Sequence, residues 1–247
     1  MNTAPPALEV IGLSRNFGGV TALADVSFTV SVGEVMCLIG PNGAGKSTLF
    51  EIVSGNLTPS AGRISYFGVD CTTQQSHMRR RAGMCRTFQK VRLFETLTVA
   101  QNIAVAASHC PKPDRNSREE VEAILSQLRL EALAARRPAG LTLADRKRVE
   151  IGRAIAGHCR LLMLDESLSG LTNEEAEHLI GEVLALNRTR GITVVVVEHV
   201  LSVLAAMVRR LVVLNNGRLI ADGTPLEVAH DPLVIEAYLG KKHSALL

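Results

Sequence analysis

Nine consecutive residues have the types and spacing needed to hold a chain of phosphate groups. They match the pattern G-x-x-x-x-G-K-[ST], in which glycines let successive backbone N–H groups turn toward phosphate oxygens. Within this loop, Lys46 would reach the β and γ phosphates, and the hydroxyl of Ser47 would fill one coordination position of Mg²⁺. The loop consists of Gly40, Pro41, Asn42, Gly43, Ala44, Gly45, Lys46, Ser47 and Thr48. We therefore predict a polyphosphate site here.

Two adjacent carboxylates follow an apolar segment further along the chain. The run 161–164 reads as a buried strand, and Asp165 and Glu166 come directly after it. The carboxyl ends of parallel strands are where ligands bind in such sheets. Because adjacent strand residues point to opposite sides, the two carboxylates are predicted to have different roles. Asp165 would hold Mg²⁺ through water, and Glu166 would orient and deprotonate an attacking water.

Three weaker features accompany these groups. His199 follows the apolar run 192–197, after Glu198, and could hydrogen-bond a γ-phosphate, although a lone histidine there is usually structural. Gln89 ends a strand candidate at 83–89 and could contact Mg²⁺ or its water. The segment 141–145 places a hydroxyl ahead of a helix N-terminus, a second anion-binding feature. An ordinary capped helix explains that last pattern, and the residues alone favour it.

The expected elements place these groups on one sheet. A strand at 34–39 enters the phosphate loop and a helix at 47–53 leaves it, so the positive helix end faces the phosphates. Apolar runs at 161–164, 192–197 and 211–214 alternate with helices that start near 173 and 200. This alternation predicts a parallel sheet that is covered on both faces.

Two further zones flank this sheet. Short strand patterns with glycines predict a small antiparallel sheet over 7–33 and 62–70. The stretch 97–157 is mostly helical by pattern, with a break at 111–114 and a new helix from 117. The predicted fold class is therefore α/β, with a mainly parallel core sheet, an N-terminal antiparallel β subdomain and an inserted α-helical subdomain.

Composition and charge limit the class of protein. Of the 247 residues 47% are apolar, so a substantial core is possible, and the net charge of +3 is too small to indicate nucleic-acid binding. The five cysteines lack C-x-x-C spacing and read as reduced thiols. No signal peptide is expected, and the longest apolar stretch, 192–208, reads as a buried strand followed by a helix. The basic segment 78–92 is expected to form a solvated helix face, rather than to contact nucleic acid or lipid.

The order of these groups along the chain resembles that of an ABC-transporter ATPase subunit. The resemblance spans about 7–240, leaving 241–247 as a short tail, and implies a single ABC ATPase domain of the P-loop class. Within the superfamily, three stretches resemble the branched-chain amino-acid importer ATPase of the Liv type: 17–23, 86–94 and 237–240.

The resemblance implies a role for each group. The nine loop residues would bind ATP, Phe17 would stack on adenine, and Gln89 would couple the site to a membrane subunit. Catalysis would rest on Glu166, His199, Lys46 and Gln89, and Mg²⁺ on Ser47, Gln89 and Asp165. Leu141, Thr142, Leu143, Ala144 and Asp145 would form the signature segment, which closes over ATP held by a second subunit.

Several residues depart from the family pattern. The usual signature is Leu-Ser-Gly-Gly-Gln, so Thr142 keeps the hydroxyl, whereas Ala144 and Asp145 replace glycine and glutamine. Asp145 adds a negative charge near polyanionic ATP unless it points away. Ser167 replaces a proline, and Thr172 stands where Asp or Asn is usual. Slower hydrolysis is therefore expected at the site that this segment completes.

The expected function is ATP hydrolysis that drives uptake of branched-chain amino acids, or a similar small solute, through a separate membrane permease. The implied partners are a second ATPase subunit, identical or different, the permease subunits and, indirectly, a periplasmic solute-binding protein; no nucleic-acid partner is expected. The expected location is the cytoplasmic face of the inner membrane. An exporter ATPase of the lipopolysaccharide type, a soluble ABC ATPase without a transport role and a binding-only regulatory subunit remain alternatives.

Overall fold

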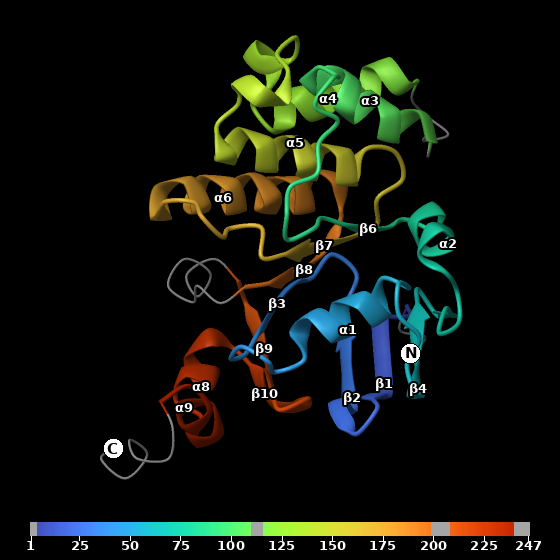
Figure 1. Ribbon diagram of the computed structural model, residues 1–247, viewed down its shortest axis with the longest axis vertical. Helices are drawn as coiled ribbons and strands as arrows, with labels where there is room; N and C mark the ends of the chain where they lie inside the picture. Colours follow the sequence, from blue (N-terminus) through green and yellow to red (C-terminus); the bar gives the residue numbers. More distant parts are fainter. Residues whose placement is uncertain (1–3, 110–115, 199–207, 240–247) are drawn as a thin grey trace. The chain divides into compact units, whose positions relative to one another are not determined.

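The computed structural model describes residues 4–109, 116–198 and 208–239. These residues form two compact units. The first combines the chain up to Arg79 with the chain from Thr193 onward, and the second spans Arg80–Ile192. Each unit is described by itself below, with the element labels of Figure 1.

The first unit contains a four-stranded antiparallel sheet with the strand order β2-β1-β4-β5. Its strands are β1 (Leu8–Phe17), β2 (Val20–Val30), β4 (Ala61–Tyr66) and β5 (Val69–Asp70). Toward the end of β2 buried and exposed residues alternate, which is the pattern of a sheet that covers a core with one face. The predicted antiparallel subdomain is confirmed.

A second sheet of the first unit carries the phosphate loop. It runs β10-β9-β3-β8, formed by Arg218–Gly223, Arg210–Asn215, Val35–Ile39 and Thr193–Val197. Strand β3 pairs in parallel with β8 and with β9, whereas β10 is antiparallel to β9. All five residues of β8 are buried, as a strand covered on both faces requires.

The helices of the first unit include α1 (Lys46–Val53), α8 (Pro225–Ala229) and α9 (Pro232–Leu239). Helix α2 (Ser76–Arg81) spans the boundary between the two units. Helix α1 starts at the phosphate loop and buries Leu49, Phe50 and Ile52. A helix that leaves the loop directly is what the sequence predicts.

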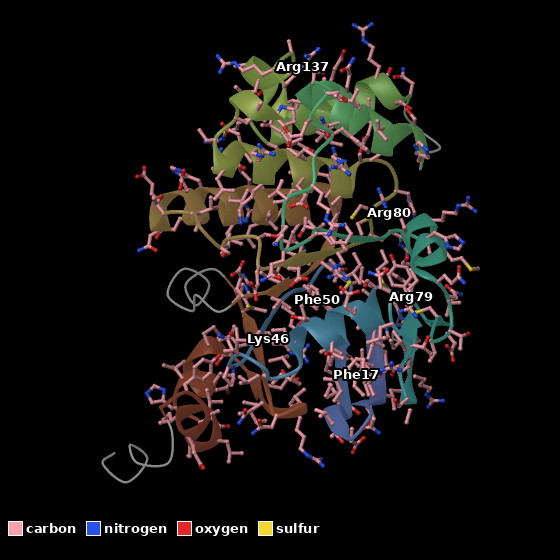
Figure 2. All side chains as sticks on the ribbon, in the orientation of Figure 1. Phe17, Lys46, Phe50, Arg79, Arg80 and Arg137 are labelled. Atoms are coloured by element: carbon pink, nitrogen blue, oxygen red, sulfur yellow. The ribbon has the colours of Figure 1, made fainter. Side chains whose placement is uncertain are left out.

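Arg79 corrects one expectation about the basic segment. Its side chain is 2% exposed rather than solvated. The guanidinium group donates to the carbonyl oxygens of Ile52 and Val53 at the end of α1, at 2.8 and 2.6 Å. Burial of this cation is possible because it satisfies the last carbonyls of a helix, which have no partner inside the helix. Figure 2 labels Arg79 among the side chains of this unit.

The second unit contains the parallel strand pair β6 (Met84–Arg86) and β7 (Leu161–Asp165), and it is otherwise mainly helical. Its described α-helices include α3 (Val99–His109), α4 (Ser117–Gln127), α5 (Leu143–Ile155) and α6 (Asn173–Arg190), and its 3-10 helices include η1 (Glu131–Leu133) and η2 (Pro138–Gly140). Figure 1 shows α3, α4 and α5 packed beside one another, with α6 alongside α5.

The predicted α/β class, with its parallel core strands, antiparallel β subdomain and helical subdomain, is confirmed. The strand candidate that ends at Gln89 is too long, because β6 ends at Arg86. Thr87 still donates its N–H to the carbonyl of Met163 on β7, but the N–H of Phe88 turns to a side chain of α5. The predicted break at 111–114 and the helix from 200 lie outside the described residues. In the described parts of the chain, no helix is both long and apolar enough to cross a membrane.

Candidate functional site

The phosphate loop requires glycine at two positions for different reasons. A Cβ atom on Gly40 would lie 2.1 Å from the carbonyl oxygen of Leu214 on β9, so no side chain fits between loop and strand. Gly45 has φ of 104°, which residues with a Cβ atom rarely adopt, and it is the N-cap residue of α1. Because Gly45 has no side chain, none occupies the first N–H groups of this helix. These N–H groups and the helix dipole favour an anion at this point.

Lys46 folds back over the phosphate loop. Its ammonium group donates to the carbonyl oxygens of Gly40 and Pro41 at 2.6 and 3.0 Å, and its side chain is buried. Ser47, the next residue of α1, is exposed. The loop therefore presents a fixed cation and, beside it, an accessible hydroxyl. Figure 2 labels Lys46 at the start of α1.

Phe17 lies at the end of β1 and is 45% exposed. The guanidinium carbon of Arg15 lies 4.6 Å from the centroid of its ring. A cation over one face of an exposed ring is a favourable contact, and it also holds the ring in place. Figure 2 labels Phe17 as well.

Asp165 ends β7 and is paired with a cation from the neighbouring strand. The guanidinium group of Arg86, at the end of β6, donates to Oδ2 of Asp165 at 2.9 Å, and both side chains are about nine-tenths buried. The backbone N–H of Asp165 donates to the hydroxyl of Thr87. These contacts fix the direction of this carboxylate at the carboxyl end of β7.

Glu166 adopts a strained backbone conformation. Its φ is 47°, in the left-handed region that residues other than Gly, Asn and Asp rarely occupy. The side-chain amide of Gln89 donates to Oε2 of Glu166 at 2.7 Å. Asp25, Phe67, Arg129 and Asn216 also have positive φ, but such strain is often found at functional sites, where the surrounding structure maintains it. The structure thus brings together Gln89 and Glu166, two of the predicted catalytic residues.

Ser167 continues this cluster of the second unit. Its hydroxyl hydrogen-bonds that of Thr87 at 2.9 Å, and its carbonyl oxygen accepts from the ammonium group of Lys147 on α5 at 2.7 Å. A proline at this position would lack the hydroxyl. Residues 87 and 167 therefore connect the segment after β6 to the segment after β7.

The predicted signature residues form the start of α5. The hydroxyl of Thr142 accepts from the N–H of Asp145 at 3.2 Å and donates to the carboxylate of Asp145 at 2.8 Å. That carboxylate also accepts from Arg148 at 3.1 Å, and Arg148 in turn is bound by Glu182 on α6. The helix cap predicted from the sequence is confirmed, and the charge of Asp145 is balanced within the chain.

Sequence reasoning did not find two residues of this region, Arg86 as the partner of Asp165 and Glu150 on α5. Glu150 accepts from the N–H of Phe88 at 3.3 Å, and its side chain is 7% exposed. Burial raises the pKa of Glu150 to about 7, against the opposing effects of the Phe88 N–H and the charge of Arg153. No local signal marks these residues, because Arg86 depends on strand register and a helical Glu is usually solvated. His199 lies outside the described residues.

Comparison with known proteins identifies the family. The profile of the ABC transporter family matches residues 23–169, and a profile described as branched-chain amino acid ATP-binding cassette transporter matches residues 218–244. The high-affinity branched-chain amino acid transport ATP-binding protein BraF of Pseudomonas aeruginosa is 35% identical, over 96% of this chain and 98% of BraF. The chain belongs to the ABC transporter family of ATP-binding cassettes.

Two further relatives agree with this assignment. The high-affinity branched-chain amino acid transport ATP-binding protein LivG of Escherichia coli is 34% identical, with coverage of 96% of the cassette and 98% of LivG. The crystal structure of the ADP conformation of MJ1267, an ATP-binding cassette of an ABC transporter, matches with a TM-score of 0.86 at 31% identity. That match covers 96% of the cassette and 99% of MJ1267. As a member of this family, the cassette is an ATPase.

The departures from the family pattern have structural counterparts in the cassette. Asp145 is held by Thr142 and Arg148, so its charge is satisfied before any nucleotide is bound. Thr172 caps α6 and exchanges hydrogen bonds with Glu175 in a capping box. Both hydroxyl groups, Thr142 and Thr172, are thus engaged by their own helices. The roles predicted for the individual site residues stay predictions.

Proposed function

We propose that the cassette hydrolyses ATP to drive the uptake of branched-chain amino acids, or of a similar small solute, through a separate permease. The observation that carries the importer assignment is the match of residues 218–244 to the branched-chain amino acid cassette profile. BraF and LivG, which are named for high-affinity transport of branched-chain amino acids, support it along almost their full lengths.

The phosphate loop of the first unit binds the triphosphate of ATP in this proposal. Gly40 and Gly45 place no side chain beside the loop backbone, and Lys46 supplies the positive charge. On binding, the ammonium group exchanges its two carbonyl partners for phosphate oxygens. Phe17, already oriented by Arg15, stacks on the adenine ring.

Magnesium fits the donor set of the cassette. Ser47, Gln89 and Asp165 offer hydroxyl, amide and carboxylate oxygens, the ligand types that Mg²⁺ prefers. Ser47 is exposed, and Asp165 is oriented by Arg86 and by the hydroxyl of Thr87. The bound ion would neutralise part of the phosphate charge.

Glu166 is the general base in this proposal. Its strained backbone and its hydrogen bond to Gln89 hold the carboxylate in one direction, so it can take a proton from an attacking water without first being ordered. The remaining work is charge stabilisation at the transferred phosphoryl group, to which Lys46 and His199 contribute.

The signature segment at the start of α5 completes the site of a second ATPase subunit. We place that pair of subunits on a membrane permease at the cytoplasmic face, with a periplasmic solute-binding protein supplying the solute. Support comes from the family membership and from the exposed Leu143 in this segment. An identical and a different second subunit both fit this arrangement.

The test combines hydrolysis with uptake. In cells that depend on this cassette, Lys46→Ala is expected to lose nucleotide binding, and Glu166→Gln is expected to bind ATP with barely measurable turnover; both abolish uptake of labelled leucine. Glu174→Gln, at an exposed carboxylate in the first turn of α6, is the control and keeps both activities. Near-normal turnover of Glu166→Gln would show that Glu166 is not the base. Recovery of the cassette only with ribosomes or DNA would contradict transport.

A further inference from the structure

The segment that carries Gln89 has no regular structure between β6 and α3, so tertiary contacts must set its position. Helix α5 supplies several of these contacts. Arg153 donates to the carbonyl of Arg92 and lies over the ring of Phe94, with 4.8 Å between the guanidinium carbon and the ring centroid. The segment is therefore held along α5 at its middle.

Helix α5 also holds the start and the end of this segment. Near its end, Arg146 of α5 forms an ion pair with Glu95. At its start, Glu150 accepts the hydrogen bond of the Phe88 N–H at 3.3 Å. Phe88 immediately precedes Gln89, so this contact fixes the backbone from which the Gln89 side chain extends.

Glu150 is well suited to fix this backbone. Its side chain is 7% exposed, and it lies within the influence of the charges of Arg153 and Lys147 and of the backbone N–H of Arg92. Lys147 is itself fixed by its bond to the carbonyl of Ser167. A buried carboxyl group that accepts from the backbone N–H groups of Phe88 and Arg92 has little rotational freedom, so the acceptor that it offers to Phe88 is fixed in space.

Gln89, in contrast, is exposed and reaches Glu166 through a hydrogen bond of 2.7 Å between its amide nitrogen and Oε2. An exposed amide on an irregular segment has many rotamers and backbone states available to it. Its alignment with Glu166 therefore depends on how firmly the preceding peptide is held.

We propose that Glu150 is a positioning residue, which orients Gln89 toward Glu166 by holding the peptide N–H of Phe88. This proposal rests on the proposed function, in which Glu166 is the general base. In this role Glu150 acts through Phe88 and Gln89 rather than on the nucleotide. Loss of its acceptor frees the Gln89 backbone and lowers the fraction of molecules in which Gln89 and Glu166 are aligned.

The test compares two variants of the full-length cassette in ATPase assays with Mg²⁺. Glu150→Leu removes the acceptor at similar volume, and its kcat is expected to fall about tenfold, the effect of one lost hydrogen bond. Its KM for ATP stays near the wild-type value, because the nucleotide is bound by other residues. Glu150→Gln retains an amide oxygen for Phe88 and is expected to recover most of the lost kcat. If Glu150→Leu does not fold, Glu150→Asp, which withdraws the oxygen by one methylene, replaces it.

The matched control is Glu120→Leu. Glu120 is also a buried helical glutamate of the second unit, bound to Arg190 on α6 and away from the Gln89 segment. It reports the effect of destabilisation alone, and its kcat below its melting temperature should equal that of the wild type. The proposal is overturned if Glu150→Leu has an unchanged or raised kcat, falls no further than Glu120→Leu, loses kcat and ATP affinity in parallel, or is not rescued by Glu150→Gln. Glu166→Gln in the same assay separates the two proposals: if it is inactive while Glu150→Leu is normal, only the positioning role fails.

Discussion

Replacing Arg79 by alanine is expected to lower the free energy of unfolding of the cassette by about 3–5 kcal/mol. The side chain is 2% exposed, and its three nitrogens donate to five backbone carbonyl oxygens over distances of 2.6 to 3.1 Å. These acceptors belong to Ile52, Val53, Cys71, Thr72 and Gln74. One side chain thus hydrogen-bonds both to the end of α1 and to the segment that leads into α2.

The magnitude follows from what the substitution leaves behind. A hydrogen bond to a charged group contributes about 1.5–3 kcal/mol, so five independent bonds would give more than the expected loss. The contributions are not additive, because burying the guanidinium group has its own cost and water entering the vacated volume satisfies some of the carbonyls. A loss of about 3–5 kcal/mol corresponds to a fall of about 10 °C in Tm for a chain of this size.

Thermal and urea unfolding of the full-length cassette measure this loss. Arg81→Ala is the matched control, since Arg81 belongs to the same helix α2 and is exposed. It should change the free energy of unfolding by less than about 0.5 kcal/mol. If Arg79→Ala and Arg81→Ala differ by less than about 1 kcal/mol, the carbonyl contacts contribute little and the reasoning is refuted.

Three other predictions concern the second unit. Because burial raises the pKa of Glu150 from its ordinary value of 4.5 to about 7, the folded state favours its protonated form. The wild-type free energy of unfolding, compared with that of Glu150→Gln, should therefore fall by about 3 kcal/mol as the pH rises from 4.5 to about 7. Urea titrations of both proteins at pH 4 and pH 8 measure this difference. If the free energies of unfolding of the two proteins change equally between these pH values, the prediction is wrong. Glu166→Gly should raise the free energy of unfolding by about 1 kcal/mol in thermal melts, because glycine adopts a positive φ without strain, and it should abolish turnover. If Glu166→Gly is no more stable than Glu166→Ala, the backbone at this position is not strained. Asp145→Gln should raise ATPase turnover by releasing the hydroxyl of Thr142 from its carboxylate partner, and equal or slower steady-state rates would show that this contact does not limit hydrolysis.

Much of the fold follows from patterns that are local in the sequence. The apolar run before Gly40 and the glycine spacing after it predict strand, loop and helix, and α1 starts within one residue of the expected position. The continuous apolar runs of β7 and β8 likewise indicate buried parallel strands. These predictions succeed because backbone sterics and burial act over a few neighbouring residues.

Contacts between distant segments were not predictable in the same way. Arg79 belongs to a basic run whose composition suggests solvent, yet the end of α1 provides carbonyl acceptors that bury it. Arg86 reaches Asp165 only because β6 and β7 pair in one particular register. Beyond the end of β6, the N–H of Phe88 finds its acceptor in Glu150, which lies far along the chain on α5.

By itself, the sequence determined the chemical groups of this protein: a phosphate loop with its lysine and hydroxyl, two carboxylates after a buried strand, and a hydroxyl, that of Thr142, just ahead of a helix. Only the tertiary structure decided how these groups are used and restrained. In the folded chain Asp145 binds Thr142 and Arg148, Gln89 donates a hydrogen bond to Glu166, and Glu150 accepts the N–H of Phe88. The physical reason is that residue type and spacing set local conformation, whereas the partner of a buried charge is chosen by whichever distant segment packs against it.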